Sequence, residues 1–270
     1  MGTIFDINSA KLFQSWYRSS QGKAMEESIN GTILALLKPQ RGERILDIGC
    51  GEGNHLLYLN SLGLDISGID ASPYMISRAR ERLGDRCTLK TGMAEDLPFD
   101  DNEFDLAVFI NTLEFLDDPL KALREAGRVA KRKVFVGVMN SLSWNCLYRK
   151  SMGIFRESIF RYVKFYNVLE LKSYVQRAYG EVPITWRCAS DRSSFYGKVD
   201  RLMTERWGIR HCPFGSFLGL SATILYKVRT EQRPLKVGLK KAENPVIRGA
   251  TMKNINRIKK GGRREGSLSL

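Results

Sequence analysis

The sequence predicts an α/β protein with a doubly wound parallel sheet and helices on both of its faces. Three observations predict this fold class. Strand-like and helix-like segments alternate five times between residues 45 and 139. The first strand ends in a glycine-rich turn that leads into a helix. Residues 104–110 are apolar on both faces, as a central parallel strand is.

The elements follow one another in a regular order along the chain. The expected strands begin at residue 45 and then cover 66–69, 87–90, 104–110 and 134–139, with helices at 52–62, 73–83 and 120–130. Ser72 and Pro73 supply the N-cap and first-turn proline of the second of these helices. Residues 8–38 carry two helical patterns separated at Gly22, so residues 1–40 are expected to form a helical cap.

Composition narrows the class of protein. A chain of 270 residues suffices for one domain with additions. No apolar run approaches the ~20 residues that span a bilayer, and the first 20 residues do not resemble a signal peptide. The five cysteines are scattered, which favours reduced thiols and a cytoplasmic location. With only two histidines, a histidine-built metal site is not expected.

The positive charge is concentrated at the C-terminal end. The chain has a net charge of +14, and from Lys227 onward 13 Lys and Arg stand against 3 Asp and Glu. The remainder therefore carries only +4. Residues 229–270 lack aromatic side chains and contain several Pro and Gly, so we expect a flexible basic tail. It is either a solvated appendage or an arm for nucleic acid or acidic membrane.

The glycine-rich turn has the pattern Asp47-x-Gly49-x-Gly51-x-Gly53. A dinucleotide fingerprint, G-x-G-x-x-G, would need glycine where Asn54 stands, and the phosphate loop G-x-x-x-x-G-K-[ST] is absent from the sequence. The pattern instead resembles motif I of the class I S-adenosylmethionine-dependent methyltransferases. The similarity to the small type 11 domain of that family extends from Phe13 to Val228.

Two further segments carry the resemblance. Asp70 follows the second strand, where a carboxylate can accept both hydroxyls of a ribose. Residues 91–99, Thr-Gly-Met-Ala-Glu-Asp-Leu-Pro-Phe, resemble the family segment G-D-A-E-x-L-P-F, which packs on adenine. Met93 departs from the family because it stands where an acid is common. Methionine offers no carboxylate to the adenine amino group, so lower cofactor affinity is expected.

The resemblance implies a Rossmann-like sheet of seven strands, mostly parallel, in domain 41–228. It also implies S-adenosyl-L-methionine as the cofactor. In that reading the cofactor-binding residues are Asp47 for the amino-acid end, Gly49, Gly51 and Gly53 for close approach, Asp70 for the ribose, Met93 and Ala94 for the adenine, and Asn111 beside the methionine portion. Tyr17, next to Trp16, either closes over the cofactor or belongs to a plain helical cap.

The catalytic group is not evident from the sequence. Residues 111–119 resemble the segment L-E-H-V-x-D-P of small-molecule relatives, but Phe115 replaces the histidine. Glu114 is then the one ionisable candidate for a base, and the alternative is a solvated residue at a helix start. Methyl transfer from a sulfonium needs a base only if the acceptor must first lose a proton.

Residues 141–180 are longer than a plain crossover and mix aromatic with basic side chains. They are expected to form a helical lid or substrate insert, and three readings stay open: packing on the body, a substrate pocket, or contact with RNA. Residues 182–188 and 218–228 are the expected last two strands, an antiparallel pair at the sheet edge by the resemblance, with a short helix at 198–207 between them.

The sequence favours a methyltransferase for a small, aromatic or lipid-like acceptor. A first alternative is an RNA or protein methyltransferase that docks through the basic tail, although the body of the chain is nearly neutral. A second is a protein that binds S-adenosylmethionine without turnover, which Met93 and Phe115 suggest. The sequence leaves the acceptor and the oligomeric state open.

Overall fold

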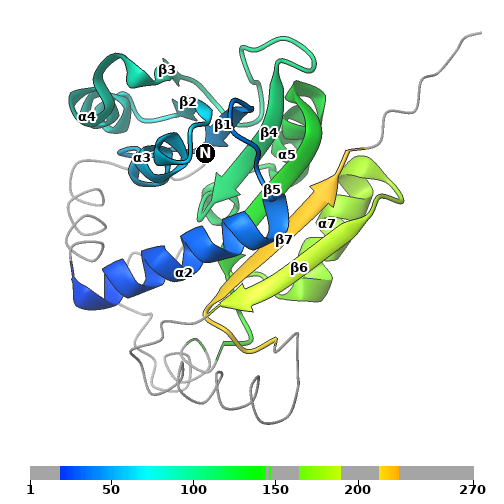
Figure 1. Cartoon of the computed structure of the whole chain (residues 1–270). Helices are drawn as coiled ribbons and strands as arrows, with labels where there is room; N and C mark the ends of the chain where they lie inside the picture. The colour runs from blue at the N-terminus through cyan, green and yellow to red at the C-terminus, as the bar shows by residue number, and fades with distance from the viewer. Residues whose placement is uncertain (1–18, 144–145, 147–163, 190–212, 225–270) are drawn as a thin grey trace, which may run out of the picture. The chain divides into compact units, whose positions relative to one another are not determined.

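The computed structural model describes residues 19–143, 146, 164–189 and 213–224 (Figure 1). All of them lie in the unit Met1–Lys227. Several predictions fall outside the described residues: Tyr17 at the cofactor, the helix at 198–207, the basic tail at 229–270, and residues 147–163 of the expected insert.

The core is one sheet of seven strands in the order β3-β2-β1-β4-β5-β7-β6. The strands are β1 (Arg44–Ile48), β2 (Asp65–Asp70), β3 (Thr88–Thr91), β4 (Phe104–Ile110), β5 (Ala130–Met139), β6 (Ile184–Ala189) and β7 (Phe217–Thr223). The first five are parallel, whereas β7 runs antiparallel to both β5 and β6. The predicted Rossmann-like fold class is therefore confirmed.

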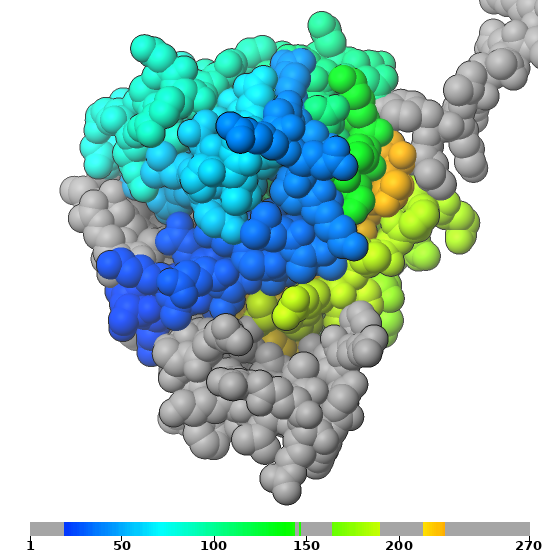
Figure 2. Space-filling model, viewed as in Figure 1, coloured from blue at the N-terminus to red at the C-terminus, as the bar shows by residue number. Residues whose placement is uncertain are grey.

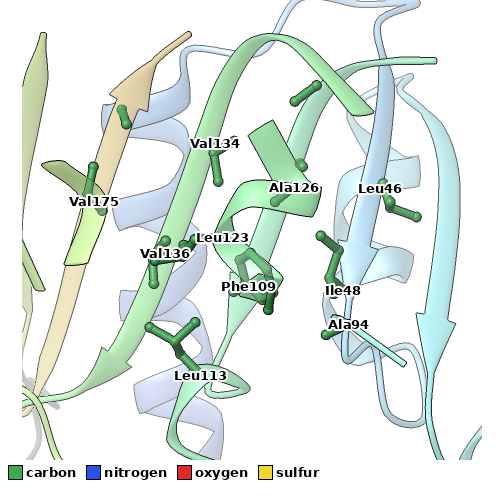
Figure 3. Packing of buried hydrophobic residues seen from close by; sticks show 14 of the residues in the cluster. Leu46, Ile48, Ala94, Phe109, Leu113, Leu123, Ala126, Val134, Val136 and Val175 are labelled. Carbon is green, nitrogen blue, oxygen red and sulfur yellow. The ribbon is translucent and has the colours of Figure 1, made fainter. Parts of the chain in front are cut away.

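Helices cover both faces of the sheet. The described helices are α2 (Ser20–Leu37), α3 (Asn54–Ser61), α4 (Pro73–Leu83), α5 (Pro119–Val129) and α7 (Val168–Tyr179), with short 3-10 turns η1 (Gly84–Arg86) and η2 (Leu113–Phe115). One buried cluster joins the sheet to α2, α3 and α4, and the other joins it to α5 and α7. Figure 3 shows the second cluster, with Phe109 of β4 near Leu123 of α5.

Helix α2 crosses the β7–β6 side of the sheet (Figure 1). In Figure 2 its dark-blue surface lies between the cyan surface of the following segment, which includes α3 and α4, and the yellow-green surface of β6. Its buried side chains Ile29, Ile33 and Leu37 pack with Phe135 and Phe217 of the sheet. The N-terminal cap region thus supplies one of the helices that cover the sheet.

Three element boundaries differ from the expected ones for local reasons. Gly22 does not interrupt a helix, because α2 begins at Ser20 and the Ser19 hydroxyl accepts the Gly22 N–H. Helix α3 starts at Asn54 rather than 52, since Gly53 has a left-handed φ of 76°. Strand β5 starts at Ala130 instead of 134. Its residues 131–133 are basic and at least partly exposed, so the apolar pattern of the strand begins only at 134.

The C-terminal part of the expected insert at 141–180, which the structure describes, helps to cover one face of the sheet. Helix α7 packs against α5, and its residues Leu171 and Val175 are fully buried in the core. Tyr166, one of the aromatic side chains considered for a substrate pocket, is also fully buried. Tyr166 and α7 therefore pack on the body of the protein, and the expected lid or substrate insert at 141–180 stays a prediction.

None of the helices in the described part of the chain has the length and apolar character that crossing a membrane requires.

Candidate functional site

A cavity opens at the carboxyl ends of the central parallel strands, the edge at which ligands bind in open α/β sheets. We call it the strand-end cavity. Figure 3 shows two residues that line the cavity, Ile48 at the end of β1 and Ala94 beside it. Its lining residues are Ile48, Gly49, Ile69, Asp70, Ala71, Ser72, Gly92, Met93, Ala94, Glu95, Asn111, Thr112, Phe115 and Leu116.

The glycine turn forms one wall and depends on the absence of side chains. Gly49 has a φ of 78°, and a Cβ built on it would lie 2.2 Å from Cγ2 of Thr112. Gly51 has a φ of 53°, and a Cβ there would meet nothing within 4 Å. The N–H groups of Gly49 and Cys50 both donate to the Ile69 carbonyl, at 2.7 and 3.0 Å. The turn is thereby closed over the end of β2 with open space at Gly51.

Asp70 is held by the backbone on both sides of its carboxylate. One oxygen accepts the Gly51 N–H and the other accepts the Ser72 N–H, both at 2.9 Å. Burial raises the pKa of the carboxyl group, and the two N–H groups oppose that rise. Each carboxylate oxygen keeps a further lone pair, which suits a pair of vicinal hydroxyls.

Asp47 lies behind the turn and is almost fully buried, with an exposed fraction of 1%. Its Oδ1 has no hydrogen-bond partner. Burial, and then the nearby Asp70 charge, raise the pKa of Asp47 to about 8. A buried carboxyl group without a partner is costly in its charged form, and a cationic group beside it would lower that cost.

The turn after β3 forms the opposite wall. Its conformation is fixed by the Gly92 N–H, which donates to the Asp70 carbonyl at 3.1 Å. Met93 is 44% exposed, whereas Ala94 is buried at 8%. Glu95, which the sequence did not single out, also lines the cavity, and its buried Oε2 has no hydrogen-bond partner. Its position directly after Ala94, in the segment that resembles the family's adenine-contacting segment, could have identified it as a wall residue.

The third wall is the stretch that follows β4. Asn111 has a φ of 53°, and its N–H donates to the Gly137 carbonyl at 2.8 Å. Its Oδ1 is buried without a hydrogen-bond partner. The Thr112 hydroxyl donates to the Gly49 carbonyl at 3.4 Å and so connects this wall to the glycine turn. Phe115 and Leu116 complete the wall with apolar surface.

Glu114 is not the solvated residue that the sequence allowed as an alternative. Its exposed fraction is 3%, and its Oε1 accepts the Met139 N–H at 2.7 Å. Burial raises the pKa of its carboxyl group to about 8. The side chain is absent from the cavity lining, so the structure does not place it where a catalytic base would act.

The described residues contain no group of three or more His, Cys, Asp or Glu side chains that could hold a metal ion. His55 in α3 is buried, and its Nδ1 lies 3.1 Å from Oδ1 of Asn30 in α2. Burial lowers the pKa of His55 to about 4. This histidine therefore connects two helices as a neutral ring.

The cavity brings together five of the nine predicted cofactor residues: Gly49, Asp70, Met93, Ala94 and Asn111. Asp47 lies behind the turn, and Gly51 and Gly53 belong to the turn itself, but none of the three lines the cavity. Tyr17 lies outside the described residues. The sequence missed Ser72, Glu95, Thr112 and Leu116 as wall residues.

Fold and site together define a Rossmann-like domain whose glycine turn and strand-end acid suit a nucleoside. Residues 46–136 match the family model of the type 11 methyltransferase domain. This segment is thus a class I, S-adenosylmethionine-dependent methyltransferase domain, and the family resemblance drawn from the motifs is confirmed.

Two curated relatives and one solved structure illustrate the similarity. An uncharacterised methyltransferase of Synechocystis is 40% identical over 81 residues, which are 30% of this chain and 38% of that protein. A sterol 4-C-methyltransferase of Caenorhabditis elegans is 27% identical over 139 residues, 48% of this chain and 42% of the relative. The matches thus span less than half of either relative.

The solved structure is a protein of Thermotoga maritima described as a possible histamine N-methyltransferase. It superposes with a TM-score of 0.62 at 22% identity, over 80% of this chain and 96% of that one. At this identity the likeness supports the fold alone.

Proposed function

We propose that this protein transfers the methyl group of S-adenosyl-L-methionine to a small, lipid-like or aromatic acceptor. The observation that carries the proposal is the charge of the strand-end cavity. Among its described lining residues the charged ones are two carboxylates, Asp70 and Glu95, and no Lys or Arg is present. This charge pattern disfavours a pyrophosphate and suits a nucleoside that bears positive charge.

The residues present fit that cofactor. S-adenosylmethionine combines a ribose, an adenine, a sulfonium and an α-ammonium group. Asp70 would accept the ribose hydroxyls, and Met93 and Ala94 would contact the adenine. Oδ1 of Asp47, behind the glycine turn, and Oδ1 of Asn111, in the cavity wall, have no hydrogen-bond partner, and both would favour the cationic methionine portion. When bound, the sulfonium supplies a methyl group already activated for transfer.

The chain's own residues would then bind, orient and exclude water. The glycine turn permits close approach because Gly51 leaves open space beside the backbone. Phe115 and Leu116 offer an apolar wall without an ionisable group. Such a wall can shield an apolar acceptor and exclude water from the reacting atoms. An acceptor that is nucleophilic without help from this wall suits it best.

The name of the Caenorhabditis elegans relative, a sterol methyltransferase, supports an acceptor of lipid-like character. The alternative with an RNA or protein acceptor rests on the basic tail, which lies outside the described residues. A cytoplasmic location stays a prediction from the sequence.

Two measurements test the proposal. Calorimetry should detect binding of S-adenosylhomocysteine and no comparable binding of NAD⁺, because a pyrophosphate lacks a cationic partner in the cavity. Labelled S-adenosylmethionine with extract of the source cells should then label the organic-soluble fraction. Label in nucleic acid or protein would instead support docking through the tail. Binding without label in any fraction would favour the non-catalytic alternative and contradict the proposal.

A further inference from the structure

Residues 111–116 form a bridge between two sides of the site. At one end the Thr112 hydroxyl contacts the Gly49 carbonyl of the glycine turn. At the other end Phe115 and Leu116 face the cavity as its apolar wall. Glu114, between them, points away from the cavity into the body of the protein, where its exposed fraction is 3%. The side chain of Glu114 therefore holds residues 111–116 from the side opposite the cavity.

Glu114 joins three separate stretches of the chain. Its Oε1 accepts the N–H of Met139, the last residue of β5, at 2.7 Å. Its own carbonyl accepts the Lys164 N–H at 3.2 Å. Tyr166 strengthens the same junction, since its N–H donates to the Met139 carbonyl at 3.3 Å and its hydroxyl to the Leu113 carbonyl at 3.4 Å. The cavity wall, the end of β5 and residues 164–166 are thus fastened together at one point.

The remaining carboxyl oxygen indicates the form in which Glu114 acts. Oε2 is buried and has no hydrogen-bond partner. An ionised carboxylate in that place would lose hydration that backbone hydrogen bonds, such as that from the Met139 N–H, replace only in part. The neutral acid is therefore favoured, and burial raises the pKa of the carboxyl group to about 8. A neutral group that contacts a backbone N–H and lies outside the cavity is suited to holding a wall rather than to removing a proton.

We infer that Glu114 is a positioning residue that fixes the Phe115–Leu116 wall against the end of β5 and residues 164–166, and so sets the placement of the acceptor. The inference rests on the proposed methyl transfer. It assigns Glu114 to the acceptor side of the site, whereas Thr112 connects the same stretch to the cofactor side. Loss of Glu114 should therefore impair transfer more than cofactor binding.

The test compares three full-length variants. Glu114→Ala removes the acceptor of the Met139 N–H, Glu114→Gln keeps a neutral acceptor of the same shape, and Asp118→Ala is the matched control. Asp118 caps α5 four residues later, is exposed, and does not line the cavity. Methyl transfer from labelled S-adenosylmethionine, at saturation, is measured into whichever extract fraction the wild-type protein labels. The dissociation constant of S-adenosylhomocysteine is measured beside it.

We expect Glu114→Ala to lower the transfer rate by about 10- to 100-fold, since a misplaced reaction geometry has effects of this size. The affinity for S-adenosylhomocysteine should change by less than about 3-fold, roughly 0.6 kcal/mol, because Glu114 does not line the cavity. Glu114→Gln should recover the rate to within a similar factor, and Asp118→Ala should transfer at the wild-type rate. If Glu114→Ala does not fold, Glu114→Met takes its place, because it fills the volume without an acceptor.

Three results would overturn the inference. A Gln variant as slow as the Ala variant would make Glu114 a proton acceptor. Parallel loss of transfer and of S-adenosylhomocysteine affinity would place it on the cofactor side. Transfer by Glu114→Ala at the wild-type rate would remove its role altogether. If the wild-type protein labels no fraction, the proposed function itself fails, and that result is distinct from the other three.

Discussion

Two cavity residues, Asp70 and Met93, differ in the hydrogen bonds that they can offer a ligand. Asp70 is fixed by two backbone N–H groups, and under the proposed function it would accept the two hydroxyls of the ribose. Met93, at the opposite wall, offers no carboxylate and is 44% exposed. The two walls therefore contribute unequally: one places a carboxylate at a fixed point, and the other provides apolar contact together with backbone groups.

Met93→Asp should improve binding of an adenine-containing ligand. The new carboxylate can accept the adenine amino group, and hydrogen bonds to charged groups contribute about 1.5–3 kcal/mol, or roughly tenfold or more in affinity. Calorimetry with S-adenosylhomocysteine should show the gain. The 6-oxo analogue, S-inosylhomocysteine, should gain nothing, because its carbonyl would face the new carboxylate. Met93→Leu is the control, and equal gains for both ligands would contradict this assignment of the adenine wall.

Glu114→Gln should change stability in a pH-dependent way. The folded carboxyl has a pKa of about 8 against an ordinary value of 4.5, so between these values the unfolded chain has lost a proton that the folded one retains. Wild-type stability therefore falls as the pH rises through this window, and glutamine does not titrate. In guanidinium chloride unfolding, the stability of Glu114→Gln relative to the wild type should therefore rise by about 4 kcal/mol from pH 4.5 to 8. A constant difference across that window would mean that the carboxyl is not buried as described.

At the scale of elements, the glycine turn and the stretch after β4 pack closely against each other. Gly49 leaves the space that the Thr112 side chain occupies, and Thr112 in turn bonds to the Gly49 carbonyl. Helices α2 and α3 form a second pair, joined by the contact of Asn30 with His55. The turn is thus supported from the cavity side and from the helix behind it.

Gly49→Ala should destabilise the fold by roughly 2–4 kcal/mol. The left-handed φ of 78° is strained for alanine, and the added Cβ would overlap Thr112. Gly31→Ala is the matched control: Gly31 is an exposed position within α2 with nothing near a new Cβ, and alanine there should add about 0.5–1 kcal/mol. Thermal unfolding of both variants measures the contrast. Equal effects at the two positions would rule out the close contact at Gly49.

The burial of His55 should make the fold sensitive to acid. Folding lowers the pKa of His55 from 6.5 to about 4, so below pH 6.5 the unfolded chain takes up a proton that the folded chain does not. Stability should therefore fall as the pH drops from 6.5 to 4, by roughly 3 kcal/mol for this one group. His55→Gln should lose that part of the pH dependence in denaturant titrations. A wild-type curve that the variant retains unchanged would show that His55 is not the group responsible.

For the molecule as a whole, the residues that line the cavity and the basic tail occupy separate parts of the sequence. The described wall residues lie between Ile48 and Leu116. Residues 229–270 carry 12 Lys and Arg against 3 Asp and Glu and lie far outside that range. Cofactor binding and tail-dependent binding should therefore be measurable as independent properties.

Deleting residues 229–270 should leave the affinity for S-adenosylhomocysteine within about twofold, as expected for a change away from the site. Binding to single-stranded RNA, if the full chain shows it, should weaken and lose most of its salt dependence, since fewer phosphates are neutralised. Calorimetry and salt-titrated fluorescence anisotropy give the two values. A large loss of cofactor affinity in the truncated chain would contradict this separation.

The sequence predicted the fold well because its signals are local. Alternating apolar segments defined the five parallel strands, and the spacing of Gly49, Gly51 and Gly53 identified the turn. The site was predicted only in part, because Thr112, Glu95 and Leu116 become wall residues through tertiary contacts that no local pattern encodes. Glu114 shows the same limit: its residue type suggested a base, whereas its orientation depends on where β5 ends.

The position of the cavity along the chain also has a consequence for engineering. The described cavity walls come from one continuous stretch, 48–116, which lies inside the segment 46–136 that the family model matches. The remaining strands, β6 and β7, add to the sheet only after β5. A chimaera that keeps this protein up to Met139 and takes the rest from a related enzyme would preserve every described cavity wall. It would keep the contact between Glu114 and the Met139 N–H and would exchange residues 164–166, the other stretch to which Glu114 joins the Phe115–Leu116 wall.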